Sequence, residues 1–217
     1  MLAHYSELFL SAFVTLFVVI DPPGCAPIFA SLTSGTSAAH RRAMAIRSVM
    51  VGAAILLVFA LFGEALLGVL GISLAAFRVA GGIMLFLIAA EMVFEKRTQR
   101  REERAEEISR RAAGDEGGSV SEDISVFPIG IPMIAGPGAI ATVMLMMSRS
   151  HGWGESGIVL AALAAALLLT LLALLTAGPL MRLVGRRIEA VVTRVLGVIL
   201  AALAAQFVID GLKAGFA

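Results

Sequence analysis

Two short segments, residues 21–24 (DPPG) and 135–138 (AGPG), carry the residue types in this sequence that could do chemistry. Proline lacks a backbone N–H and clashes with the preceding helical turn, and glycine lowers helix preference, so both segments should interrupt the apolar stretches around them. Inside a membrane, an interrupted backbone is tolerated only where protein or a polar cavity surrounds it. Two such breaks in corresponding places indicate a binding site built from interrupted helices.

The chemistry of these breaks follows from helix ends. A half-helix that starts at Gly24 or Gly138 would present N–H groups and the positive end of its dipole, which suit a carboxylate. A half-helix that ends before a break presents carbonyl oxygens, which suit an ammonium group or a small cation. A zwitterion such as an amino acid fits this pair of helix ends. The alternative is that the glycines bind nothing and only let two helices cross closely. The candidate substrate-binding residues at the breaks are Asp21, Pro23, Gly24, Cys25, Gly136, Pro137 and Gly138.

Asp21 is the most informative acid because it lies deep in an apolar segment, where a charge is costly and marks a functional site by default. It could carry a coupling proton or contact an ammonium group. An aspartate before a proline is also a good helix N-cap, so both interpretations stay open. Further candidate ligand contacts are the hydroxyls of Ser11, Thr15, Ser125 and Thr142, although such groups often bond their own backbone instead.

The elements that must position these residues are membrane-spanning helices. Of the 217 residues, 59% are hydrophobic, and the mean hydropathy is +0.95, which predicts an all-α integral membrane protein. A spanning helix needs about 20 mostly apolar residues. Six segments qualify, at roughly residues 8–32, 43–67, 74–94, 124–148, 156–181 and 191–211, with the first and the fourth interrupted.

The two halves of the chain resemble each other. Pro23 and Gly24 match Pro137 and Gly138 at an offset of 114, and the RVAG at residues 78–81 resembles RVLG at an offset of 116. Three spans in each half make the halves enter the membrane from opposite sides, as an inverted repeat. The sequence therefore predicts a first membrane repeat at 1–95, a charged cytoplasmic linker at 96–123 and a second repeat at 124–217.

Basic residues set the predicted orientation. Thirteen of the 17 lysine and arginine residues fall in the loops after the first, third and fifth spans. Because such residues stay in the cytoplasm, both termini should lie on the non-cytoplasmic side. The linker is expected to join the halves, and a docking role for it is the alternative.

Several classes of protein are disfavoured. The single cysteine, Cys25, excludes an intrachain disulfide and a cysteine metal cluster. No P-loop and no matched catalytic pair occur in the sequence, so we expect neither an enzyme nor a metal or other cofactor, and nothing indicates nucleic-acid binding. A coupling proton or sodium ion is left open, as is homo-oligomerisation.

The sequence resembles the MarC family of bacterial inner-membrane proteins. The matching text is DPPG at 21–24 with APIF at 26–29, GIS at 71–73 with FRVAGG at 77–82, IPMIAGPGAI at 131–140 and RVLG at 194–197. The family is similar to amino-acid exporters of the LysE type and includes proteins described as small neutral amino-acid transporters, for glycine and alanine. The resemblance thus implies a six-span secondary transporter. One departure is Cys25, where the family usually has asparagine.

We therefore expect a secondary transporter of small neutral amino acids, of the glycine and alanine class, that works by alternating access in the bacterial inner membrane. Its expected partners are a small-molecule substrate and the lipid bilayer. The alternative is a non-transporting scaffold or regulatory protein that acts through the charged linker. The direction of transport is left open.

Overall fold

The computed structural model describes residues 2–94 and 125–216, and every regular element within them is a helix. The elements are α1 (Leu2–Ile20), α2 (Pro22–Leu32), α3 (Ala38–Val69), α4 (Leu74–Val93), η1 (Ser125–Ile134), α7 (Pro137–Arg149), α8 (Gly152–Leu175) and α9 (Ala177–Phe216). All are α-helices except η1, which is a π-helix. The predicted linker, residues 96–123, lies outside the described residues.

Five helical stretches in the described part of the chain are long and apolar enough to cross a membrane. They are His4–Leu32, Ala38–Val69, Leu74–Val93, Gly152–Leu175 and Ala190–Phe216. This confirms the predicted all-helical integral membrane protein. The predicted fourth span, residues 124–148, is divided between η1 and α7 and is not among the five.

Two helix starts are defined by serine caps. Ser37 precedes α3 and its hydroxyl accepts a hydrogen bond from the N–H of His40, at 3.2 Å. Ser73 precedes α4, and its hydroxyl accepts a hydrogen bond from the N–H of Ala76 in the same way, at 3.1 Å. Each cap satisfies one of the N–H groups that a helix start leaves without a partner.

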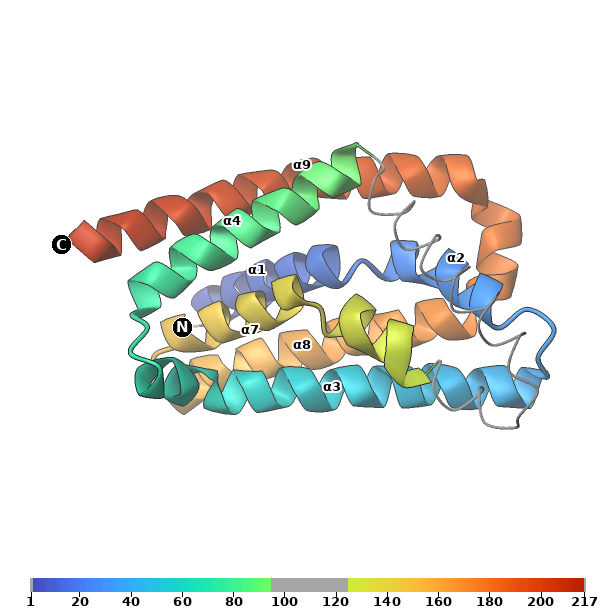
Figure 1. The fold of residues 1–217 in the computed structure, drawn as a ribbon, viewed down its shortest axis with the longest axis horizontal. Coiled ribbons are helices and arrows are strands. Elements are labelled where there is room, and N and C mark those ends of the chain that lie inside the picture. The colour runs from blue at the N-terminus through green and yellow to red at the C-terminus, as the bar shows by residue number, and fades with distance from the viewer. Residues whose placement is uncertain (1, 95–124, 217) are drawn as a thin grey trace.

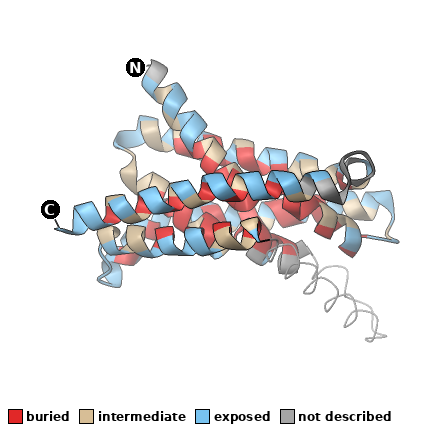
Figure 2. Ribbon diagram, turned by 90° about the horizontal axis from the view of Figure 1, so that it is seen from above, coloured by how far each residue is buried: buried red, intermediate tan, exposed pale blue. Residues whose placement is uncertain are grey.

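The helices run roughly along one long axis, with buried residues concentrated between them (Figures 1 and 2). The segment formed by α1 and α2 packs against α8, whereas η1 and α7 pack against α3. The remaining pair, α4 and α9, cross along much of their length (Figure 1). Each broken segment is therefore held by a long, unbroken helix of the other half of the chain.

The crossing of α4 and α9 depends on small residues. A Cβ atom on Gly82 would lie 2.9 Å from the carbonyl oxygen of Ala204, and one on Gly197 would lie 3.1 Å from that of Ala89. The backbones also approach closely at Gly211, where an added Cβ atom would lie 3.0 Å from the carbonyl oxygen of Ala75, so glycines allow close contact at three places along the crossing.

Both ends of the chain lie at the same end of the bundle, together with the α3–α4 and α7–α8 turns (Figure 1). Two polar side-chain contacts join helices there. The guanidinium of Arg149 lies 2.7 Å from the carboxylate of Asp210, and so connects the end of α7 to α9. The ring of His4 lies 3.1 Å from the carboxylate of Glu155, and so connects α1 to α8.

Candidate functional site: the two helix breaks

The first break is a single residue. Asp21 separates α1 from α2, with φ 59° and ψ 63°, and it is only 1% exposed. This left-handed conformation is uncommon outside glycine, although aspartate tolerates it better than most residues. The chain changes direction here because Pro22 and Pro23, which follow at once, cannot continue the hydrogen bonding of α1.

The start of α2 offers no free N–H group. Pro22 and Pro23 have none, and the N–H of Gly24 donates to the Asp21 carboxylate at 3.1 Å. The next N–H, that of Cys25, donates to the Asp21 carbonyl at 3.0 Å. The prediction that N–H groups at Gly24 bind an anion is therefore wrong for this break. The two prolines have no N–H, and the aspartate cap already uses that of Gly24.

Gly24 is needed for this cap. A Cβ atom at this position would collide with the carboxylate of Asp21. The DPPG sequence therefore acts as one unit, in which the prolines start the helix, the aspartate caps it and the glycine leaves room for the cap.

Hydrogen-bond acceptors dominate the first break. Pro22 and Pro23 supply no N–H to the carbonyls of Val18 and Val19, four residues back in α1. The carbonyl of Ile20 receives the Cys25 thiol at 3.5 Å. Together with the Asp21 carboxylate, these oxygens make the break attractive to a cation. Sequence reasoning missed these individual carbonyls, although the helical i to i+4 rule applied to the two prolines would have found them.

The second break has the opposite character. Gly136 precedes α7 in an extended conformation, with φ −76° and ψ 166°, and no side chain of the described residues caps the helix. Pro137 supplies no N–H, and the first backbone bond runs from Ile140 to the Gly136 carbonyl at 3.0 Å. The N–H groups of Gly138 and Ala139 thus lie at an uncapped, positively polarised helix start, as the sequence predicts.

The two breaks are neighbours. A Cβ atom on Gly138 would lie 3.4 Å from a methyl group of Val19, beside the first break. It would also lie 3.4 Å from Leu85 and 2.6 Å from Ile88, both on α4. Gly138 therefore packs tightly between α1 and α4, which is the close crossing weighed as the alternative to a substrate contact.

The four hydroxyl candidates differ. Thr15 is buried and donates to the Ser11 carbonyl at 2.7 Å, while the Ser11 side chain is exposed. The side chain of Ser125 lies outside the described part of the structure. Thr142 is 0% exposed, and its hydroxyl has no hydrogen-bond partner among the described residues.

Among the described residues, the buried threonines Thr15, Thr33 and Thr170 bond carbonyls of their own helices, whereas the hydroxyls of Thr142 and Thr193 have no partner there. The hydroxyl of Thr170 donates to the carbonyl of Ala166, four residues back, at 2.8 Å. Thr142 lies four residues after Gly138 and hence on the same face of α7, with its Cβ inclined toward the start of that helix. An unsatisfied buried hydroxyl one helical turn after two uncapped N–H groups is an arrangement that can accept a polar ligand.

The other candidates are placed as follows. Cys25 is buried, Pro23 and Gly136 are half-buried, and Pro137 is exposed. Two pockets lined by described residues lie elsewhere, one between α4 and α9 and one between α3, α7 and α8. The breaks themselves are closely packed in this conformation.

The long apolar helices and the buried breaks between them define a multi-pass, all-helical integral membrane protein. The family described as MarC family integral membrane protein matches residues 6–216, and the chain therefore belongs to the MarC family.

Curated relatives agree with this assignment. The UPF0056 membrane protein MJ1677 of Methanocaldococcus jannaschii is 36% identical over 211 residues, which cover 95% of this chain and 97% of the relative. YvbG of Bacillus subtilis is 36% identical over 204 residues, which cover 94% of this chain and 93% of the relative. The inner membrane protein YhgN of Escherichia coli K12 is 32% identical over 206 residues, or 94% and 95%. These names state a membrane location and no activity, and no solved structure matches the chain.

Proposed function

We propose that the chain is a secondary transporter of small neutral amino acids, of the glycine and alanine class, that works by alternating access in the bacterial inner membrane. The observation that carries this proposal is the opposite polarity of two adjacent breaks. One break offers only acceptors, at Asp21 and the carbonyls before it, and the other offers uncapped N–H groups at Gly138 and Ala139. A zwitterion is the ligand that satisfies both.

The proposed binding mode follows from this polarity. The substrate ammonium lies toward Asp21 and the carbonyls of Val18 and Val19. The carboxylate accepts from the N–H groups at the start of α7 and from the hydroxyl of Thr142. The walls formed by Val19, Leu85 and Ile88 around Gly138 leave little room, which favours the smallest side chains. The same acceptors are where a coupling proton or sodium ion would act.

An inverted repeat supports alternating access. In the first half of the chain, the broken segment of α1 and α2 packs on α8 of the second half. In the second half, the broken segment of η1 and α7 packs on α3 of the first half, so the two arrangements correspond. The broken helices restart at Pro22 and Pro137, which are 115 residues apart. The glycines at the α4–α9 crossing, Gly82 and Gly197, differ by the same 115, and so do the carbonyls that they approach. The same offset of 115 residues therefore relates both the helix breaks and the glycine contacts of the α4–α9 crossing. It lies between the offsets of 114 and 116 found in the sequence.

Six spans complete the proposal. Together η1 and α7 cover residues 125–149, which is more than the about 20 residues that a spanning helix needs. With the basic loops inside, both termini are placed on the non-cytoplasmic side. Substrate and lipid are the partners of this function, which needs no enzymatic step and no resident cofactor. The scaffold alternative depends on residues outside the described ones.

Thr142→Val tests the substrate site. It removes the unsatisfied hydroxyl and keeps the shape of the side chain, so the thermal stability of the protein should not fall. We expect counterflow of radiolabelled glycine and alanine in proteoliposomes to fall about tenfold or more, because a hydrogen bond to a charged group is lost. Thr193→Val is the matched control, since it removes the other buried threonine hydroxyl without a partner among the described residues, on α9 and not at either break. Gly138→Leu would be a poor test, because the added side chain meets Ile88.

The experiment distinguishes an error in the proposed function from an error in the proposed position of the substrate. No counterflow of any small neutral amino acid by folded wild-type protein would contradict the proposed function. Counterflow that survives Thr142→Val would keep the function and move the carboxylate elsewhere.

A further inference from the structure

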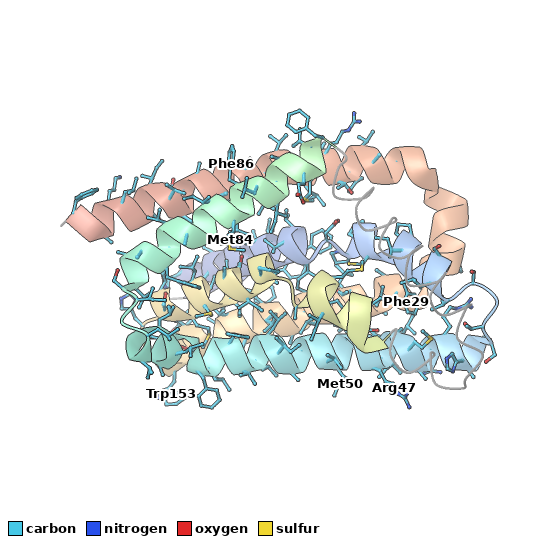
Figure 3. All side chains as sticks on the ribbon, viewed as in Figure 1. Phe29, Arg47, Met50, Met84, Phe86 and Trp153 are labelled. Carbon is cyan, nitrogen blue, oxygen red and sulfur yellow. The ribbon has the colours of Figure 1, made fainter. Side chains whose placement is uncertain are left out.

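A second polar feature of the protein is a pocket of about 390 Å³ between α3, α7 and α8, away from the breaks. It opens at the end of the bundle where the chain termini lie. Its polar lining includes Glu64 and Ser156, with Trp153 at its edge, and its apolar lining includes Phe59, Met147 and Leu160. Trp153 is 96% exposed and points away from the bundle (Figure 3).

The polarity of this pocket changes with depth. Glu64 lies five residues before the end of α3, about 8 Å along the helix, whereas Phe59 lies about 15 Å along it. Trp153 lies in the first turn of α8, and Leu160 lies about 10 Å further in. Tryptophan at this depth is typical of the membrane interface. The pocket thus has a polar mouth at the interface and an apolar floor in the hydrocarbon layer.

The charge of the mouth is negative. Within the described residues, the exposed carboxylate of Glu64 makes no hydrogen bond or ion pair. The nearby Glu155 is already used, because it accepts from the N–H of His151 at 2.7 Å and contacts His4. Arg149, the cation at the end of α7, is paired with Asp210 on α9. Glu64 is therefore available to a positively charged ligand that enters from the membrane.

We propose that this pocket binds a phospholipid with a primary ammonium headgroup, such as phosphatidylethanolamine. The ammonium lies at Glu64, the hydroxyl of Ser156 contacts the headgroup, and an acyl chain runs along Phe59, Met147 and Leu160. The positive headgroup matches the negative charge at the mouth of the pocket, and the apolar acyl chain matches its apolar floor. This site does not depend on the proposed transport function, since its ligand is the bilayer itself.

The test compares two lipids with identical acyl chains on the full, delipidated protein in detergent, by native mass spectrometry. Phosphatidylethanolamine carries the ammonium, and phosphatidylglycerol does not. We expect wild-type protein to bind phosphatidylethanolamine about fivefold more tightly, the ratio typical of one interfacial charge pair. Glu64→Gln should reduce this ratio to about one without weakening phosphatidylglycerol. Glu7→Gln is the matched control, because Glu7 is an exposed carboxylate of α1 outside the pocket.

A second variant tests the pocket itself. No atom lies within 4 Å of a Cβ placed on Gly157, which lines the pocket, so Gly157→Phe fills it without a clash at the backbone. We expect saturable binding of both lipids to fall at least severalfold. Equal affinities of the wild type for the two lipids, a ratio that Glu64→Gln leaves unchanged, or binding that Gly157→Phe leaves intact would each overturn the proposal.

Discussion

Asp21 has two properties that the sequence left as alternatives. It caps α2 through Gly24, and it places a buried carboxylate, in a residue 1% exposed, beside the carbonyl end of α1. The cap does not use up the carboxylate, because a capping hydrogen bond occupies one of about four lone-pair positions on its oxygens. Capping and cation attraction can therefore coexist at this residue.

Two substitutions separate these roles. Asp21→Ala leaves the Gly24 N–H buried without its acceptor, which should lower the free energy of unfolding by about 1–3 kcal/mol. Asp21→Asn keeps an oxygen for the cap and removes the charge, so thermal stability in detergent should stay close to that of the wild type. If the charge attracts the substrate ammonium or the coupling ion, glycine counterflow falls in both variants. Full counterflow by Asp21→Asn would leave Asp21 as a cap only.

At the scale of elements, the α4–α9 crossing holds the two halves together. Its contacts repeat with one offset, because Gly82 faces Ala204 and Gly197 faces Ala89. Equivalent contacts on both helices are what a two-fold relation between the halves requires. The broken helices, by contrast, differ in polarity, so the symmetry of the frame does not extend to the chemistry of the site.

We predict that Gly82→Ala and Gly197→Ala destabilise the protein to a similar degree, by about 1–3 kcal/mol each, because each added methyl group meets a backbone carbonyl. The apparent unfolding temperature in detergent measures this. Gly68→Ala in α3 is the control, since no atom lies within 4 Å of its added Cβ, and it should keep or slightly raise stability. A much larger effect at one crossing glycine than at the other would contradict the equivalence of the two contacts.

At the scale of the whole molecule, the open question is whether residues 125–149 cross the membrane. Their division into η1 and α7 keeps them out of the five long apolar stretches, yet their summed length suffices for a crossing. If they cross, the α7–α8 turn and the linker lie on opposite sides of the membrane. If they do not cross, both lie on the same side.

Cysteine labelling with a membrane-impermeant maleimide distinguishes the two topologies. In a Cys25→Ala background, six spans predict that Trp153→Cys is labelled from outside intact cells and that Ser109→Cys, in the predicted linker, is protected. With five spans the two positions would share one side and one labelling result. Labelling of both after permeabilisation is the control for reactivity, and Trp153 suits it because it is almost fully exposed.

Much of this architecture could be predicted from local chemistry. The apolar stretches predict the membrane helices, Ser73 predicts the start of α4, and the DPPG and AGPG segments predict where helices break. The sequence did not predict the unequal donors of the two breaks. That inequality depends on whether a side chain folds back onto a helix start, which Asp21 does and Gly136, lacking a side chain, cannot.

By itself, the sequence determined the class of protein and the position of both breaks, because hydropathy and the missing N–H of proline act locally wherever the chain folds. Only the tertiary structure decided that Val19 and Gly138 are neighbours, that Thr142 is buried without a partner, and that Gly82 and Gly197 form equivalent crossings. Each of these depends on the packing of helices from different halves of the chain. Packing is set by the shapes of many side chains together, which no single stretch of sequence contains.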